Sequence, residues 1–303
     1  MDFVPAPPFP PRTPARPRPA VAQAQAAASA HELAPYRPDA QRAVRVRSRR
    51  LAASTRIEPH RHPWAQVAYS STGVLRVSAE QHTYIVPPSR AVWIPPGVEH
   101  VVTVVEDAEL RTLYLHVPAG RSGPAAIGRT EGLRAAAHWQ HCRVLEVSPL
   151  LRVLVEQIGD AAALQPPPAP PAERERLLAT LLQDELRRAR PVPLGVGLPQ
   201  DKRLRTLCEA VLDDPARHAT LPGWAREAGA SARTVARLFR QELGTTFAEW
   251  RQQVLLAKAL SMAARKRPMA HIAAELGYAS ASAFSAMVTR SVGMPPSRFF
   301  AAA

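Results

Sequence analysis

Apolar residues recur at helical spacing through the last third of the chain, residues 200–303, and predict a block built only of helices. Helices are expected over Asp201–Leu212, Leu221–Ala228, Ser231–Leu243, Phe247–Arg267, Met269–Leu276 and Ser280–Val292. Turns of small residues precede Ser231 and Ser280, and each serine is a good N-cap for the helix that follows it. The pattern therefore predicts two helix–turn–helix units joined by one long helix.

The two units form a repeat along the chain. Ser231 and Gly244 of the first unit correspond to Ser280 and Gly293 of the second, each pair 49 positions apart. A rigid helix of about 20 residues, at ~1.5 Å per residue, would hold the second helices of the two units roughly 30 Å apart. One turn of DNA is ~34 Å long, so both helices could enter successive major grooves on one face of a duplex.

Residues 51–120 change from helical spacing to short β-branched and aromatic runs separated by turn residues. The runs expected to be strands are Gln66–Tyr69, Val74–Val77, His82–Val86, Ala91–Ile94, Val98–Val105 and Arg111–Val117. Closely spaced strands with polar turns are typical of a sandwich or a small barrel.

Two further helices are predicted between residues 121 and 190. The first begins with Ser148 as N-cap and Pro149 at its first helical position. The second, Ala172–Arg190, carries one leucine-rich face, formed by Leu177, Leu178, Leu181, Leu182 and Leu186. Such a face must be buried, either in the chain's own core or against a second copy in a homodimer.

The net charge of +14 is placed unevenly. Residues 1–50 carry nine Arg against three acidic residues, and residues 200–303 carry fifteen Lys and Arg against eight. This placement favours a polyanion partner, because Lys and Arg gain affinity by releasing counterions from phosphates. An arginine-rich composition would produce a basic chain without one.

Cysteine content and hydropathy narrow the class of protein. Cys142 and Cys208 are too few for a disulfide framework or for a zinc site alone, so both are expected to be small buried side chains in a reducing compartment. No apolar run reaches the ~18 residues that a membrane span needs. We therefore expect a cytoplasmic protein without a membrane partner.

The last third of the chain resembles the DNA-binding domain of the AraC/XylS family of bacterial transcriptional regulators. The residues that carry this resemblance are Leu221, Trp224, Ala225, Ala228, Gly229, Ser231, Arg233, Thr234, Arg237, Leu238, Phe239, Glu242, Leu243, Gly244, Ile272, Ala273, Leu276, Gly277, Tyr278, Ser280, Ala283, Phe284, Gly293 and Pro295. It implies a regulator that binds a double-stranded DNA operator and contacts RNA polymerase. Val288 stands where the family usually has Phe, which predicts looser packing of the last helix.

The resemblance also implies which side chains contact DNA. Arg233, Thr234 and Arg237 of the first unit are expected to face the major groove, where an arginine can make two hydrogen bonds to guanine, worth about 1–3 kcal/mol of discrimination. Arg240 and Arg251 are expected at phosphates, contacts that position the protein without specifying sequence.

The second unit has fewer hydrogen-bond donors at the corresponding positions. Its exposed residues are expected to be small: Ala281, Ser282, Ala283 and Ala286. Ser282 and Arg290 are its best available donors, so base recognition should depend mainly on the first unit.

Upstream, the chain resembles the cupin sensor domain of one branch of the same family, through His60-x-His62-x3-Gln66-x6-Gly73 and Pro95-x-Gly97-x2-His100. In cupins, such histidines and a carboxylate bind one metal inside the barrel. The candidate ligands here for a divalent transition metal are His60, His62, Gln66 and His100, with Gln66 as a neutral and weaker replacement for the carboxylate. The alternatives are a metal-free pocket that hydrogen-bonds a small-molecule effector, and a vestigial cluster.

The candidate residues of an effector pocket are Trp64, Gln66, Trp93 and His100, and Tyr114 and His116 could join them. The sequence does not determine which residues of each strand point into the barrel. Trp64, Trp93, Tyr114 and His116 could therefore equally lie in the core.

The predicted fold class is α+β and multidomain. A disordered tail rich in Pro, Ala and Arg (1–50) precedes a cupin-like β-barrel sensor domain (51–120), a helical linker and dimerisation region (121–190), a linker (191–199) and an AraC-type DNA-binding domain with two helix–turn–helix units (200–303). A sequence-specific transcriptional regulator without catalytic residues, which senses a small molecule or a metal, accounts for every part.

Two other functions account for less. A metal-dependent cupin enzyme fused to DNA-binding units would explain the histidines, but neither Gln66 nor the tandem units. A non-specific architectural protein would explain the charge, but not the spacing of the units.

Overall fold

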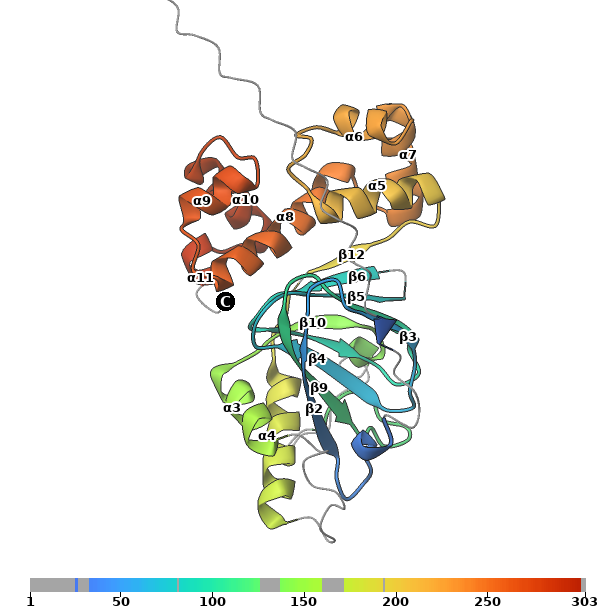
Figure 1. The fold of residues 1–303 in the computed structure, drawn as a ribbon, viewed down its shortest axis with the longest axis vertical. Coiled ribbons are helices and arrows are strands. Elements are labelled where there is room, and N and C mark those ends of the chain that lie inside the picture. The colour runs from blue at the N-terminus through green and yellow to red at the C-terminus, as the bar shows by residue number, and fades with distance from the viewer. Residues whose placement is uncertain are drawn as a thin grey trace, which may run out of the picture.

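Two six-stranded sheets form the N-terminal half of the molecule, and helices form the C-terminal half (Figure 1). The computed structural model describes residues 25–26, 33–80, 82–125, 137–159, 172–192 and 194–300. The strand order is β1-β3-β8-β5-β6-β12 in the first sheet and β11-β10-β7-β4-β9-β2 in the second.

The strands are short, and all neighbours except β1 and β3 run antiparallel. The first sheet contains β1 (Gln25–Ala26), β3 (Arg56–His60), β5 (Leu75–Ala79), β6 (His82–Val86), β8 (His100–Val104) and β12 (Gly195–Gly197). The second contains β2 (Val44–Leu51), β4 (Ala65–Ser70), β7 (Arg90–Ile94), β9 (Ala108–Leu115), β10 (Arg143–Glu146) and β11 (Pro191–Val192). The six predicted strands are confirmed.

The two sheets stack as a sandwich, one of the two predicted forms, and they are not closed into a barrel; the predicted α+β class is confirmed. Within the described residues the edge strands of one sheet do not pair with those of the other. Inward-pointing residues such as Leu75, Val92 and Val102 form the core between the sheets. Gly73 turns the chain between β4 and β5 at φ +74°, where a Cβ would collide with the backbone oxygen of Asp107.

Helices α3 (Pro149–Ile158) and α4 (Glu173–Arg188) cover the outer face of the second sheet (Figure 1). The predicted cap of α3 is confirmed, because Ser148 Oγ accepts a hydrogen bond from the Leu151 amide at 3.0 Å. The leucine-rich face of α4 is split: Leu182 and Leu186 are fully buried in the chain's own core, whereas the remaining leucines are partly or largely exposed.

The helical C-terminal half has the predicted tandem organisation. Its helices are α5 (Lys202–Asp213), α6 (Leu221–Glu227), α7 (Ala232–Leu243), α8 (Phe247–Ala264), α9 (Met269–Glu275), α10 (Ala281–Val292) and α11 (Pro296–Phe300). Ser231 and Ser280 cap α7 and α10, each through a 3.1 Å bond from a backbone amide to its hydroxyl. Both helices end at a left-handed glycine, Gly244 or Gly293, because glycine has no Cβ to clash in that conformation.

Helix α8 lies between the two helix–turn–helix units and packs against both (Figure 1). The rings of Phe239 in α7 and Trp250 in α8 are 5.7 Å apart, and both side chains are fully buried. In the second unit Phe284 and Val288 are fully buried as well. Val288 therefore belongs to the core, and the looser packing expected there stays a prediction.

Two predicted boundaries are wrong. Residues 44–50 were predicted to belong to the disordered tail, but they form most of β2, because Val44 and Val46 pack against the helices. The arginines between these valines made the segment resemble the rest of the charged tail. The linker at 191–199 contains β11 and β12, which join the sheets through backbone hydrogen bonds that need no apolar pattern. Strands β3 and β10 were also not predicted.

Two smaller predictions concern cysteines and membrane spans. Cys142 and Cys208 are buried and are not joined to each other, as predicted. No helix in the described part of the chain combines the length and hydropathy that crossing a membrane requires.

Replacing Phe239 by Ala should destabilise the first helix–turn–helix unit by about 3–5 kcal/mol, because the substitution opens a cavity beside Trp250. The change would be measured as the free energy of unfolding in urea. Gln241→Ala, at an exposed position of the same helix, is the control and should change that free energy by less than about 0.5 kcal/mol. A comparable loss from both variants would contradict this account of the core.

Candidate DNA interface and effector site

The exposed face of α7 carries the predicted base-reading arginines. Arg233 and Arg237 are both exposed and lie one helical turn apart, opposite the buried Val235 and Phe239. The Nη1 of Arg237 donates to Gln241 Oε1 at 2.6 Å, which extends the guanidinium along the helix surface. The structure therefore brings these two arginines together on the solvent side of a capped helix.

Thr234 lies at the start of the same helix, with its Oγ1 2.9 Å from the hydroxyl of the capping Ser231. In α10, Ser282 and Arg290 are exposed, while Phe284 and Met287 are buried. The second unit thus has the same orientation of core and solvent faces, but smaller side chains on the solvent face.

A groove of about 1100 Å³ separates the two units along α8, and Arg240, Arg251 and Arg290 lie in its wall. Arg240 is exposed, as a phosphate contact requires. Arg251 is different: its Nε and Nη2 both donate to the carbonyl of Pro215, at 3.0 and 2.7 Å, and burial lowers the pKa of its guanidinium. Arg251 therefore holds the loop before α6, and its expected contact with a phosphate stays a prediction.

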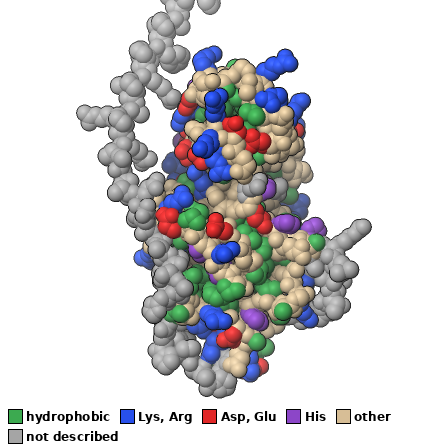
Figure 2. Space-filling view, turned by 90° about the vertical axis from the view of Figure 1, so that its right-hand side faces the viewer, with side chains coloured by type: hydrophobic (Ala, Val, Ile, Leu, Met, Phe, Trp, Pro, Cys, Tyr) green, Lys and Arg blue, Asp and Glu red, His purple; other side chains and the backbone are tan. Residues whose placement is uncertain are grey.

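Positive side chains are concentrated where these helices lie. On the face drawn in Figure 2, Lys and Arg side chains gather at the upper end of the molecule, over the helical half. A surface of this kind suits a polyanion, because cationic side chains displace the counterions of a nucleic acid.

Three histidines converge between the sheets. His60 ends β3, His100 begins β8 directly opposite it, and His62 follows β3. Their nearest ligand atoms all lie within 4.8 Å of one another, which is a spacing that one metal ion can bridge. The register of β3 shifts between Ile57 and His60, and this irregularity aims the strand end inward.

Backbone carbonyls fix the orientation of each imidazole. The Nδ1 atoms of His60, His62 and His100 lie 2.8, 2.7 and 3.0 Å from the carbonyl oxygens of Glu58, Trp64 and Val98. Since a carbonyl only accepts, each Nδ1 carries the hydrogen and each Nε2 keeps a lone pair. This is the arrangement in which histidines bind metals through Nε2.

Burial keeps the histidines neutral. Desolvation lowers the pKa of all three, and for His100, which is 1% exposed, it lowers the pKa to about 3, helped by the charges of His60 and His62. The Nε2 of His100 is buried and has no hydrogen-bond partner within the described residues. A neutral imidazole with a free lone pair is a ready metal ligand.

Gln66 completes the cluster, with its Oε1 2.9 Å from the Nε2 of His62. If His62 donates through Nδ1 to the Trp64 carbonyl, its Nε2 is an acceptor, and so is the Gln66 Oε1 that faces it. Either the Gln66 amide is turned so that its NH2 donates to Nε2, or both atoms bind one cation. Gly97, whose amide donates to the carbonyl of His62 at 2.8 Å, holds the histidine loop in place. The cluster therefore fits a divalent metal with Nε2 and amide ligands.

Aromatic residues enclose one side of this cluster. Trp64 stacks on His62 with ring centroids 5.1 Å apart, and Tyr114 meets His62 edge-on at 5.6 Å. His116 is half-buried just beyond β9. Trp93 was predicted in the pocket, which is wrong: it points to the outer face of the second sheet, where its indole donates to the Trp139 carbonyl at 3.0 Å.

Sequence reasoning missed the arginines of β2. Arg45, Arg47 and Arg49 alternate with apolar or small residues, so they share the inner face with the histidine cluster. The alternation was visible in the sequence, but it lay inside a segment rich in Arg that had been assigned to the tail.

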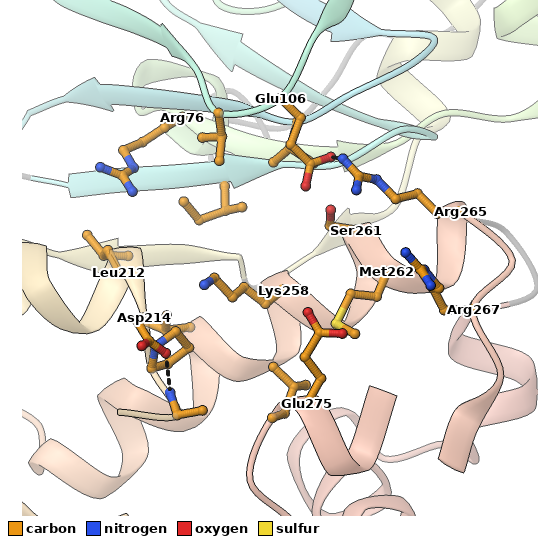
Figure 3. A pocket seen from close by; sticks show the side chains of 17 residues that line it. Arg76, Glu106, Leu212, Asp214, Lys258, Ser261, Met262, Arg265, Arg267 and Glu275 are labelled. Carbon is orange, nitrogen blue, oxygen red and sulfur yellow. Dashed lines mark hydrogen bonds and ion pairs between the residues drawn. The ribbon is translucent and has the colours of Figure 1, made fainter. Parts of the chain in front are cut away.

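A cleft of about 940 Å³ lies where the sheets meet the helical half (Figure 3). On the sheet side Arg76 pairs with Asp213 at 2.9 Å, and Glu106 pairs with Arg265 from the end of α8. Lys258 Nζ donates to the carbonyl of Asp213 at 2.6 Å. The two halves of the chain are therefore joined by ion pairs across this cleft.

A second connection passes through the segment between the halves. Strand β12 pairs with β6, and the indole of Trp250 in α8 donates to the Gly197 carbonyl at 2.7 Å. The segment between the halves is therefore bonded to the first sheet on one side and to α8 on the other.

Comparison with known proteins assigns both halves. Residues 43–189 match the AraC-like ligand binding domain, and residues 224–302 match a helix-turn-helix domain. The HTH-type transcriptional regulator NimR of Escherichia coli (strain K12) is 31% identical over 242 residues, which cover 80% of this chain and 81% of NimR. The chain belongs to the AraC family of transcriptional regulators.

Two further proteins are less similar to this chain than NimR is. The arabinose operon regulatory protein of Salmonella typhimurium is 29% identical over 127 residues, 41% of this chain and 45% of that protein. Among solved structures, ToxT from Vibrio cholerae with a bound unsaturated fatty acid covers 85% of this chain and 95% of ToxT, at 11% identity and a TM-score of 0.33. The assignment to the AraC family rests on the sequence relatives, and it gives this chain a ligand-binding domain and a DNA-binding domain.

Proposed function

We propose that α7 supplies most of the base recognition by which this AraC-family regulator selects its operator. The observation that carries the proposal is the pair Arg233 and Arg237, exposed together on one face of a capped helix in a helix–turn–helix unit. An arginine pair at this spacing can reach two base steps of a major groove, each through a bidentate contact to guanine. Thr234 lies beside them, and Arg240 is suited to a neighbouring phosphate.

Helix α10 is the second DNA-contacting helix in this proposal, with a different role. Ser282 and Arg290 are its exposed donors, and between them its exposed surface is made of small residues. Small side chains permit close approach but supply few base-specific hydrogen bonds. We therefore assign α10 to docking on the duplex and to contact with RNA polymerase.

The regulator acts as a homodimer in this proposal. Leu150 and Val153 of α3 and Leu177 and Leu181 of α4 are 50%, 50%, 56% and 44% exposed, although they belong to the two helices that cover the second sheet. Apolar side chains gathered on one exposed helical face are typical of an interface. A second copy of the same helices would bury them.

The sensor half binds a divalent transition metal or a small-molecule effector on the inner face of its sheets. His60, His62 and His100 present three Nε2 atoms to one point, and Gln66 adds an amide oxygen. The candidate pocket residues that remain on this face are Trp64, Gln66 and His100. We assign no catalytic step to the cluster, since the relatives are transcriptional regulators and no carboxylate takes the place of Gln66.

In this proposal, ligand binding to the sensor half affects DNA binding through the contacts between the two halves. The first sheet is joined to α8 through β12 and through the ion pairs Arg76–Asp213 and Glu106–Arg265. A shift of the first sheet on ligand binding would change how far both helix–turn–helix units can move relative to the sensor half. In this proposal the protein acts in the cytoplasm, where its operator is.

Arg237→Ala should lower the ratio of operator affinity to non-specific affinity by about tenfold or more, because the bidentate base contact is lost. The ratio would be measured by mobility shift on a site found by genome-wide mapping of bound DNA. Ser282→Ala should change it less, and Arg226→Ala, an exposed arginine of α6, should leave it unchanged. Unchanged selectivity of Arg237→Ala, or an equal loss from Ser282→Ala, would contradict the assignment.

Leu177→Glu with Leu181→Glu should convert the dimer into a monomer, since buried carboxylates in an apolar interface are costly to desolvate. Sedimentation velocity measures the change in mass. Val105→Glu, at an exposed valine away from these helices, is the control and should remain dimeric. A monomeric wild-type protein, or a dimeric double variant, would show that this face is not the interface.

His100→Gln should abolish the binding of a divalent metal such as Zn²⁺ or Ni²⁺, because it removes the most buried of the three imidazoles. Gln66→Glu should tighten that binding by about tenfold or more, since a carboxylate replaces a neutral amide. Both effects are measured as metal content and by competition with a chelator. His82→Gln, at an exposed histidine, is the control. Wild-type protein that takes up no more metal than His100→Gln would argue for a metal-free pocket.

A further inference from the structure

One hydrogen bond on the exposed face of α7 holds a base-reading side chain in a fixed direction. The Nη1 of Arg237 donates to the Oε1 of Gln241 at 2.6 Å, and the two residues are four positions apart on the helix. Residues at this spacing are neighbours on a helix surface. Both side chains are exposed, so the pair lies on the solvent side of α7, where a duplex can reach it.

The guanidinium of Arg237 keeps most of its donors for DNA. Gln241 takes only a hydrogen of Nη1, and no other described residue bonds to Arg237. The edge formed by Nε and Nη2 therefore remains free. A guanine presents O6 and N7 as neighbouring acceptors in the major groove, and one edge of an arginine can bond to both.

Gln241 is poorly placed to read a base itself. A glutamine recognises adenine through both ends of its amide, because the oxygen accepts from N6 while the nitrogen donates to N7. In α7 the amide oxygen already accepts from Arg237, which can only donate. The effect of Gln241 is therefore on the direction of the arginine.

The direction of an arginine matters because its side chain is long and rotates freely. Fixing a free side chain on binding costs conformational entropy, and a side chain that is already held in place loses less. A free guanidinium can also turn to a phosphate, a contact that carries no sequence information. The bond to Gln241 reduces the entropic cost for Arg237 and limits its access to the phosphates.

The other two candidate readers of α7 are held differently. Arg233 makes no hydrogen bond or ion pair with another described residue, so its guanidinium is free to move. The Oγ1 of Thr234 lies 2.9 Å from the hydroxyl of Ser231, so its polar group is occupied at the helix cap. Arg237 is thus the one long donor among these three residues that is held by a side chain of its own helix.

The second helix–turn–helix unit lacks this pair. The positions 49 residues after Arg237 and Gln241 hold Ala286 and Arg290. An alanine has no donor to be directed, and the arginine stands where the first unit has its glutamine. The arrangement therefore belongs to the unit that carries the two arginines one turn apart.

We propose that Gln241 is a positioning residue for base recognition, which holds Arg237 so that this arginine reads one guanine of the operator stringently. Arg233, which is not held, tolerates changes at its own base step. The inference deepens the proposed base-reading role of α7 and rests on it. It names the base that the most stringent position of the operator must carry, and a residue outside the contact that determines this stringency.

The test removes one guanine acceptor at a time. Duplexes of an operator found by genome-wide mapping would carry a single 7-deazaguanine, which lacks N7, at each guanine in turn. The affinity of the full-length protein for each duplex is measured by fluorescence anisotropy at fixed ionic strength. For the wild type we expect one guanine whose replacement weakens binding by about fivefold or more. Arg237→Ala should lose the response at that guanine.

Variants at Gln241 separate positioning from other roles. Gln241→Ala should reduce the response at that guanine to about twofold or less, and it should have no further effect in an Arg237→Ala background. Gln241→Glu keeps an oxygen that accepts from Arg237, so it should keep the response, while its charge weakens binding to every duplex by a similar factor. Gln200→Ala, the same substitution at an exposed glutamine outside α7, is the control and should keep the full response. Urea unfolding of each variant shows that it folds.

The outcomes distinguish this inference from the proposed function. A wild type without a sensitive guanine, or a response that survives Arg237→Ala, would overturn both, because α7 would then not read bases through this arginine. A response that is lost in Arg237→Ala but complete in Gln241→Ala would overturn the inference alone.

Two further results would assign Gln241 another role and also overturn the inference. Equal weakening of all duplexes by Gln241→Ala would make it a structural residue or a phosphate contact. A further loss in the double variant with Arg237→Ala, together with sensitivity to the replacement of an adenine, would show that Gln241 reads DNA directly.

Discussion

The alternation of side chains along the second sheet is the constraint on which the sensor half depends. On its outer face, Val46, Val67 and Trp93 pack against α3 and α4 and fix those helices in place. On its inner face the same strands present Arg47 and Gln66 beside the histidines. A shift of one residue in the register would exchange these two faces, so the apolar core that stabilises the fold also aims the polar groups inward.

The inner face combines chemistry that is rarely buried without a ligand. Three neutral imidazoles, from β3, β8 and the loop after β3, lie within reach of one metal ion, and the arginines of β2 lie on the inner face of the facing sheet. Burying the imidazole Nε2 of His100 without a hydrogen-bond partner among the described residues costs desolvation energy, which a bound cation would offset.

The DNA-binding half is a duplication whose copies have diverged in chemistry but not in fold. Both second helices begin at a serine cap and end at a left-handed glycine, and both bury an aromatic residue against the core. Helix α7 carries two long donors one turn apart on its exposed face, Arg233 and Arg237, whereas α10 carries Arg290 near its C-terminal end and small residues before it. Helix α8 holds the copies at a fixed spacing and also contacts β12, so the element that sets their geometry is the one that touches the sensor.

The sequence by itself determined the helices, their caps and the family, because local signals such as Ser231 and Gly244 specify them without distant partners. It also identified His60, His62 and His100, since two short motifs carry them. Only the tertiary structure decided that Trp93 faces outward, that Arg251 binds a loop carbonyl, and that residues 44–50 and 195–197 are strands. Each of those depends on a partner far along the chain: the parity of β7 is set by the helices it packs against, and β12 exists because β6 offers it a free edge.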